Sequence, residues 1–109
     1  MRVVHHRGGV ARVRRGYIAH PLGAGPDREA NRQRASRWVA WAASQGVAPV
    51  ADWTRAKGLA IDCALVARCD ELWLVGGRIS RGMQVEADAA RAAGVMVVDR
   101  TDLGEEPPG

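Results

Sequence analysis

Glu86 is the residue whose type and position most directly suggest chemistry. The apolar residues 71–75 predict a short buried strand, residues 76–82 a loop containing glycine and serine, and residues 83–93 an alanine-rich helix closed by Gly94. Glu86 is therefore expected in the first turn of a helix that follows a strand, where open α/β sheets place their ligands. The backbone N–H groups and dipole there favour anions, so we expect an ionised Glu86 with a phosphate able to bind beside it. The alternative is an acid that only stabilises the helix start.

The elements that must position Glu86 alternate between strands and helices. Further strands are predicted over residues 13–19, 47–51 and 95–98, and further helices over residues 26–44 and 59–68. Such alternation implies parallel pairing, so we predict an α/β three-layer sandwich around a small parallel sheet of about four strands, flavodoxin- or Rossmann-like. The strand order 2-1-3-4 would bring the ends of the first and third strands together. Pro49 argues for an edge position of the second strand.

Length and composition limit the class of protein. With 109 residues, 47% of them hydrophobic, the chain has room for one core. We predict a basic extension over residues 1–12, a domain over 13–103 and a flexible tail over 104–109. No apolar run approaches the roughly 20 residues of a membrane span, so we expect a cytoplasmic protein without a membrane partner. Two cysteines without clustered histidines predict no metal site.

The formal net charge of +4 comes from one end of the chain. Residues 1–15 carry five arginines and no acid, whereas the rest carries 11 basic and 12 acidic residues. A near-neutral body offers no broad cationic face for a duplex. We therefore expect no nucleic-acid partner, except for weak binding through the basic arm. The alternative is an extension that is flexible or that adds a strand.

Four pieces of the chain stand in an order and spacing that carry a family resemblance. They are the segment from Tyr17 to Leu22, then Asp62, then the segment from Cys69 to Trp73, and finally Ser80-Arg81-Gly82 followed by Glu86. Together they resemble the nucleoside 2-deoxyribosyltransferase-like superfamily over about residues 13–98, most closely its short bacterial and phage members. The resemblance implies a nucleoside or nucleotide as partner, no cofactor, and a homodimer or higher homo-oligomer.

The resemblance also implies catalytic roles. The family's nucleophile is a glutamate four residues after a glycine, which matches Glu86 after Gly82. A tyrosine on the first strand orients it, and Tyr17 is the match. An aspartate eight residues before the acid that opens the third strand contacts the base and helps it leave, and Asp62 stands eight before Asp70. Taken alone, Asp62 could be a solvent-facing helix residue and Tyr17 a packing residue.

The residue six positions before the nucleophile separates two branches of the family. Transferases that act on free nucleosides tend to carry a carboxylate there, and hydrolases of 5′-monophosphates a serine, so Ser80 implies a phosphate site. The other expected substrate-binding residues are Arg81, Gly82, His20, Pro21 and Gly23. A carboxylate can stabilise or capture the oxocarbenium-like state of N-glycosidic cleavage, while Asp62, with a raised pKa, protonates the base.

The implied function is an N-glycosidase that hydrolyses the base–sugar bond of a nucleoside 5′-monophosphate. The alternatives are a nucleoside 2-deoxyribosyltransferase and a non-catalytic nucleotide-binding or sensing module. His20 replaces the glycine of many relatives, where it could narrow the pocket, contact phosphate or mark a protein that binds without turnover. Trp53, on a loop, is a candidate for stacking on the base. The short segment 52–57 leaves little to cover the base, so a second subunit is expected to complete the site.

Overall fold

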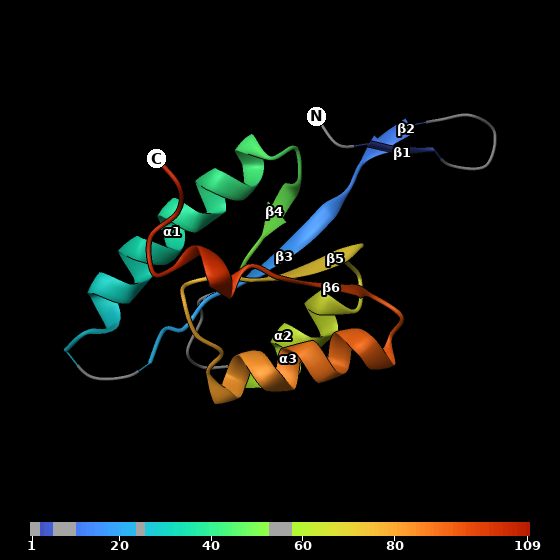
Figure 1. The fold of residues 1–109 in the computed structure, drawn as a ribbon. Coiled ribbons are helices and arrows are strands. Elements are labelled where there is room, and N and C mark those ends of the chain that lie inside the picture. The colour runs from blue at the N-terminus through green and yellow to red at the C-terminus, as the bar shows by residue number, and fades with distance from the viewer. Residues whose placement is uncertain (1–2, 6–10, 24–25, 53–57) are drawn as a thin grey trace.

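The sheet of this protein has four parallel strands. The computed structural model describes residues 3–5, 11–23, 26–52 and 58–109 (Figure 1). The strands are β3 (Arg15–Ala19), β4 (Ala48–Val50), β5 (Glu71–Leu74) and β6 (Met96–Asp99), in the order β4-β3-β5-β6. This is the predicted order 2-1-3-4, so the predicted α/β sandwich with a small parallel sheet is confirmed. Pro49 lies on the edge strand β4, where a missing N–H donor is tolerated.

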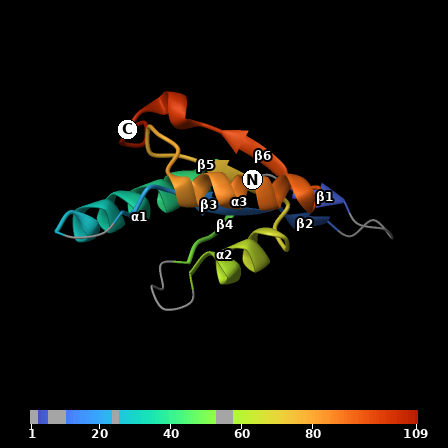
Figure 2. The same ribbon diagram turned by 90° about the horizontal axis from the view of Figure 1, so that it is seen from below.

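Helices cover both faces of the sheet (Figure 2). Helix α1 (Arg28–Ser44) packs on one face, and α2 (Gly58–Val66) and α3 (Arg81–Ala92) pack on the other. Successive strand residues point to opposite faces. Ile18 and Trp73 accordingly join Trp38 of α1, whereas Tyr17 and Leu72 join the core under α2 and α3. No helix in the described ranges is both long and apolar enough to cross a membrane.

The first predicted strand, residues 13–19, is divided in the structure. Strand β1 (Val3–His5) pairs antiparallel with β2 (Ala11–Val13) in a separate two-stranded sheet that projects from the body (Figure 1). Val13 pairs with Val3, whereas Arg15 already pairs with Ala48 of the main sheet. The prediction of one continuous strand was wrong because the chain leaves the two-stranded sheet at Arg14 and enters the main sheet at Arg15.

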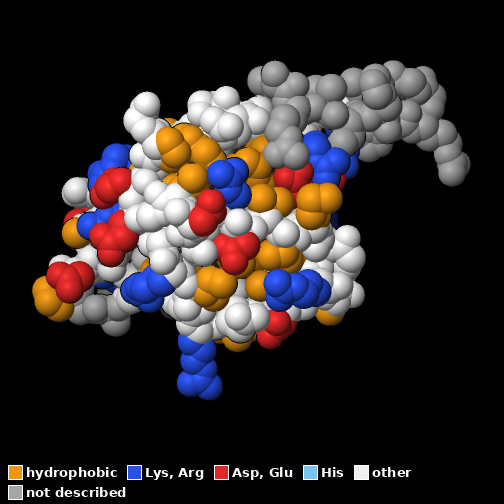
Figure 3. Space-filling view, in the orientation of Figure 1, with side chains coloured by type: hydrophobic (Ala, Val, Ile, Leu, Met, Phe, Trp, Pro, Cys, Tyr) orange, Lys and Arg blue, Asp and Glu red, His pale blue; other side chains and the backbone are white. Residues whose placement is uncertain are grey.

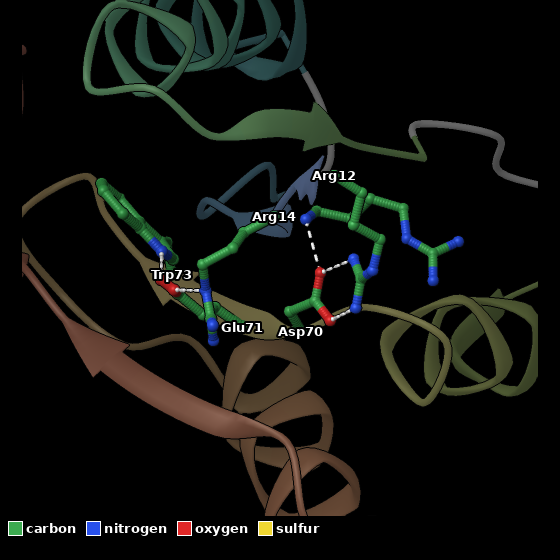
Figure 4. A network of polar contacts seen from close by, with 6 residues as sticks. Arg12, Arg14, Asp70, Glu71 and Trp73 are labelled. Atoms are coloured by element: carbon green, nitrogen blue, oxygen red, sulfur yellow. Dashed lines mark hydrogen bonds and ion pairs between the residues drawn. The ribbon is translucent and has the colours of Figure 1, made fainter. Parts of the chain in front are cut away.

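A network of ion pairs joins this hairpin to the amino end of β5 (Figure 4). Arg12 donates to both carboxyl oxygens of Asp70, at 2.6 and 2.5 Å. Arg14 Nε donates to Glu71 Oε2 at 2.7 Å, and Trp73 Nε1 donates to Glu71 Oε1 at 2.8 Å. Glu71 is completely buried. Two arginines of the basic amino-terminal end are therefore neutralised by acids of the body. On the face seen in Figure 3, acidic and basic side chains are interspersed.

The carboxy-terminal segment lies beside α1 (Figure 1). Glu106 accepts hydrogen bonds of 2.9 Å from Arg34 and Arg37, and the Trp38 indole N–H donates to the Glu105 carbonyl at 2.9 Å. Glu105 and Glu106, in the segment 104–109 predicted as a flexible tail, thus contact α1 in the structure. These contacts close the α1 side of the molecule, away from the face on which α2 and α3 pack.

Candidate functional site

An open pocket of about 370 Å³ lies where the connections after β3 and β5 leave the main sheet toward opposite faces. Strand β3 leads into α1 on one face, and the neighbouring β5 leads into α3 on the other, so their carboxyl ends diverge at a topological switch point. The predicted site residues that line the pocket are Glu86, Asp62, Tyr17, Ser80, Arg81, Gly82, His20 and Gly23. The structure therefore brings together residues from β3, α2 and α3 that are far apart in the sequence.

Helix α3 begins two residues earlier than predicted, which changes the setting of Glu86. Ser80 has the extended conformation of an N-cap, and its Oγ accepts a hydrogen bond of 3.3 Å from the Met83 N–H. The helix therefore starts at Arg81 and its first turn contains no acid. The prediction of Glu86 in the first turn was wrong. Ser80 accepts a hydrogen bond from an N–H group of the first turn, so the helix begins at Arg81 and Glu86 lies in the second turn.

Burial, not the helix dipole, sets the charge state of Glu86. Glu86 is only 6% exposed, and it lies on the same buried face of α3 as Met83 and Ala87. Burial raises the pKa of Glu86 to about 7; a hydrogen bond from Tyr17 lowers it, and the nearby carboxyl group of Asp62 raises it. The expectation that the helix start keeps Glu86 ionised was therefore wrong, and Glu86 exchanges its proton near neutral pH.

Tyr17 is held as a hydrogen-bond donor beside Glu86. It is the central residue of β3 and is 2% exposed, on the face covered by α2 and α3. Burial, followed by the charges of Glu86 and Asp62, raises the pKa of Tyr17 well above its usual range. The hydroxyl therefore stays protonated at any physiological pH and can donate to the Glu86 carboxylate, which is the geometry an orienting residue requires.

Asp62 faces the pocket from α2. Its Oδ1 is buried and has no hydrogen-bond partner among the described residues, so Asp62 is not the solvent-facing helix residue of the alternative interpretation. Burial raises the pKa of Asp62 to about 6, together with a hydrogen bond to Asp52, while Tyr17 and Glu86 lower it. An unpartnered buried oxygen with an elevated pKa suits a group that hands a proton to a ligand.

The start of α3 leaves space in the pocket. A Cβ built on Gly82 would meet only Leu59 Cδ2, at 3.5 Å, which is ordinary contact. Packing therefore does not require glycine, although glycine weakens a helix by roughly 1 kcal/mol relative to alanine. The space in front of Gly82 belongs to the pocket, which Ser80 and the exposed Arg81 also line. These residues and the helix N–H groups can receive an anion.

Of the three predicted binding residues in the loop after β3, His20 and Gly23 line the pocket and Pro21 does not. Gly23 lines the pocket, whereas Pro21 is buried near Gly76 and does not line it. Both ring nitrogens of His20 are buried without partners among the described residues, and burial lowers its pKa to about 4, with Arg34 and Arg78 contributing in the same direction. A neutral His20 lines the pocket but supplies no positive charge to a phosphate.

Sequence reasoning missed the two other charged residues that line the pocket, Asp52 and Arg28. Asp52 follows the edge strand β4 at the carboxyl end of the sheet, and that position was the available signal. Arg28 opens α1 and donates a hydrogen bond of 2.9 Å to the Gly23 carbonyl, so it also shapes the loop after β3. Trp53, the predicted stacking residue, lies outside the described residues. Among the described residues, no three acids, histidines or cysteines are grouped as metal ligands.

Comparison with known proteins adds one similarity. Residues 52–100 match a family described as a domain of unknown function (DUF7768). The matched segment covers less than half of the chain and includes Asp52, Asp62, Ser80 and Glu86, but not Tyr17 or the loop after β3. No curated protein matches the chain. The part of the pocket built by Asp52, α2 and the start of α3 therefore lies within the segment that matches that family.

Proposed function

We propose that this protein is an N-glycosidase that hydrolyses the base–sugar bond of a nucleoside 5′-monophosphate through Glu86. The observation that supports it most is the convergence of Tyr17, Asp62 and Glu86, from three different elements, in one pocket. Tyr17 remains a donor, and Asp62 and Glu86 both titrate near neutral pH, so the charged and the protonated form of each carboxyl group are available to the reaction. The resemblance to the nucleoside 2-deoxyribosyltransferase-like superfamily assigns the same three residues.

The proposed reaction has two steps. The Glu86 carboxylate attacks the anomeric carbon while Asp62 gives its proton to the departing base, so the C–N bond breaks as a glycosyl ester forms. Tyr17 donates a hydrogen bond that holds the attacking carboxylate. Water then attacks the anomeric carbon, loses a proton to Asp62 and releases Glu86 with the sugar phosphate.

The phosphate of the substrate is assigned to the other lining groups. Ser80 uses its oxygen lone pair for the Met83 N–H, and its hydroxyl hydrogen is available to donate. Arg81, Arg28 and the start of α3 supply positive charge or N–H donors along the same pocket. The volume, about 370 Å³, lies in the range of small-molecule sites.

The test is release of free base from a panel of nucleosides and their 5′-monophosphates, followed by chromatography. Base release from monophosphates, with slower release from nucleosides, supports the proposal. Base exchange that requires a second free base instead indicates a transferase. Tight binding of monophosphates without any release indicates the non-catalytic module. Gly82→Val fills the space at the start of α3 and is expected to weaken monophosphate binding at least tenfold.

A further inference from the structure

Asp52 is a third carboxyl group in the pocket, beyond the two that the proposed reaction uses. It stands two residues after the end of β4 and lines the same pocket as Asp62 and Glu86. A nucleophile and a general acid account for Glu86 and Asp62, and neither role needs a further acid. Placing another carboxyl group beside two others is electrostatically unfavourable. Asp52 is therefore best explained by a contact with the ligand.

The interaction between Asp52 and Asp62 determines which of them donates. Two carboxyl groups form a hydrogen bond only when one is protonated. Burial, and then the hydrogen bond to Asp52, raises the pKa of Asp62, which is the direction expected when Asp62 holds the proton of that hydrogen bond and Asp52 accepts it. The other titratable groups around Asp62 are Tyr17 from β3, Glu86 from α3 and Cys63 from its own helix. The arginines of the pocket wall are Arg28 and Arg81.

A purine base that reaches Asp62 would meet a donor and an acceptor side by side. N7 of every purine is an acceptor, and the neighbouring position 6 carries an amino donor in adenine but an oxygen acceptor in guanine and hypoxanthine. When such a base binds, the Asp62 proton can turn from Asp52 to N7, which assists departure of the base. A carboxylate beside it accepts a hydrogen bond from a 6-amino group and repels a 6-oxygen.

We infer that Asp52 is a specificity residue that makes the pocket select 6-aminopurine nucleotides over 6-oxopurine nucleotides. The inference rests on the proposed function, which brings the base to Asp62, and it adds the substrate class. Glu86 and Asp62 act on both kinds of purine in the same way. Asp52 alone distinguishes them, because its oxygens can only accept.

The experiment compares adenosine and inosine 5′-monophosphates, in ribo and deoxy forms, which differ in the group at position 6 of the base and in the N1 proton that accompanies the 6-oxygen. The parent is expected to have a kcat/KM at least tenfold higher for the adenine nucleotide. Asp52→Asn presents an amide that can donate to a 6-oxygen or accept from a 6-amino group, so the ratio should fall towards one. Any effect of the variant on Asp62 or Glu86 cancels in this ratio. The control is Asp88→Asn, an exposed acid of α3 bound by Gln84, which should keep the parent ratio.

The outcomes separate this inference from the proposed function. Turnover with a ratio near one in the parent, or with an unchanged ratio in Asp52→Asn, overturns the inference and leaves the N-glycosidase standing. If no nucleotide releases base, calorimetric binding of the same nucleotides decides. If the parent binds the adenine nucleotides more tightly and Asp52→Asn abolishes this preference, the inferred selectivity is supported, although the proposed N-glycosidase activity is refuted. Binding without preference, or no binding, overturns the inference.

Discussion

Glu86 and Asp62 are both carboxyl groups, and the proposed reaction needs them in opposite protonation states. Glu86 is the more deeply buried and receives the Tyr17 hydroxyl, which stabilises its charged form. Burial and the hydrogen bond to Asp52 raise the pKa of Asp62 and so favour its protonated form. A nucleophile needs the charged form and a general acid needs the protonated form. Because the pKa of Glu86, about 7, is higher than that of Asp62, about 6, the form of the pair with one proton carries it mainly on Glu86, and the reactive arrangement is the less populated of the two.

This division predicts a bell-shaped pH dependence of kcat/KM. The active form carries one proton on the pair, on Asp62, with Glu86 ionised. Below about pH 6 both groups are protonated and the nucleophile is lost, whereas above about pH 7 both are ionised and the acid is lost. Activity should therefore peak between these values and fall about tenfold per pH unit on either side. A rate measured from pH 4 to pH 9 that rises continuously would contradict the assignment.

The buried carboxyl group of Glu86 also predicts how stability depends on pH. Its pKa rises from 4.5 to about 7 on folding, so the stabilisation is fully present below pH 4.5 and is lost as the pH rises through 7. Ionisation of Glu86 at pH 8 then costs about 3 kcal/mol of stability, which Glu86→Gln avoids. The melting temperature of Glu86→Gln minus that of the parent should therefore be larger at pH 8 than at pH 4. Glu29→Gln, at an exposed site of α1, should show no such dependence; equal behaviour of both variants would refute a buried Glu86.

At the scale of elements, two connections shape the pocket. The loop after β3 lies against the turn after β5, where Gly76 adopts a φ of +99° and leaves no room for a side chain. Ser80 then caps α3 and fixes where Glu86 points. Both connections leave the sheet at the switch point between β3 and β5, so small changes in either one displace groups of the pocket.

Gly76→Ala tests the packing between these two connections. A Cβ there would come within 2.6 Å of the His20 ring and 2.8 Å of Pro21 Cδ. We expect a loss of about 3 kcal/mol in the free energy of unfolding, from the positive φ and the clash together. Gly94→Ala is the matched control, because its φ of +73° is similar but nothing lies within 4 Å of the added methyl. It should lose only about 1 kcal/mol. Equal losses in urea titrations would show that the loop after β3 is not packed on Gly76.

The hairpin is joined to the body by a buried acid, and that junction is also testable. Arg14→Ala removes the arginine that donates to the Glu71 carboxylate and leaves that buried carboxylate with the Trp73 indole as a donor, so it should cost about 3 kcal/mol of stability. Arg37→Ala breaks an ion pair whose two side chains are about half exposed, and should cost less than about 1 kcal/mol. If thermal or urea unfolding finds no difference between the variants, the network at β5 does not stabilise the fold.

At the scale of the whole molecule, the sequence predicted the layout better than the details of charge and boundaries. Strand order followed from the alternation of apolar strands and helices, and Pro49 indicated the edge. Helix α3 starts earlier than the sequence predicted because Ser80, a predicted ligand group, is also its N-cap, a position that serine favours. The raised pKa of Glu86 and the contact of Asp52 with Asp62 depend on burial by distant elements, which local sequence does not reveal. Glu71 was likewise assigned to a buried strand without its partner Arg14.

The most direct test of the central claim is base release by Glu86→Gln. Glutamine keeps the size and hydrogen-bonding capacity of the side chain but cannot form the glycosyl ester, so we predict a folded variant that binds the monophosphate as well as the parent and releases base at least a thousandfold more slowly. Glu29→Gln, handled identically, should retain the parent rate. A Glu86→Gln variant that releases base as fast as the parent would contradict the assignment of Glu86 as the nucleophile.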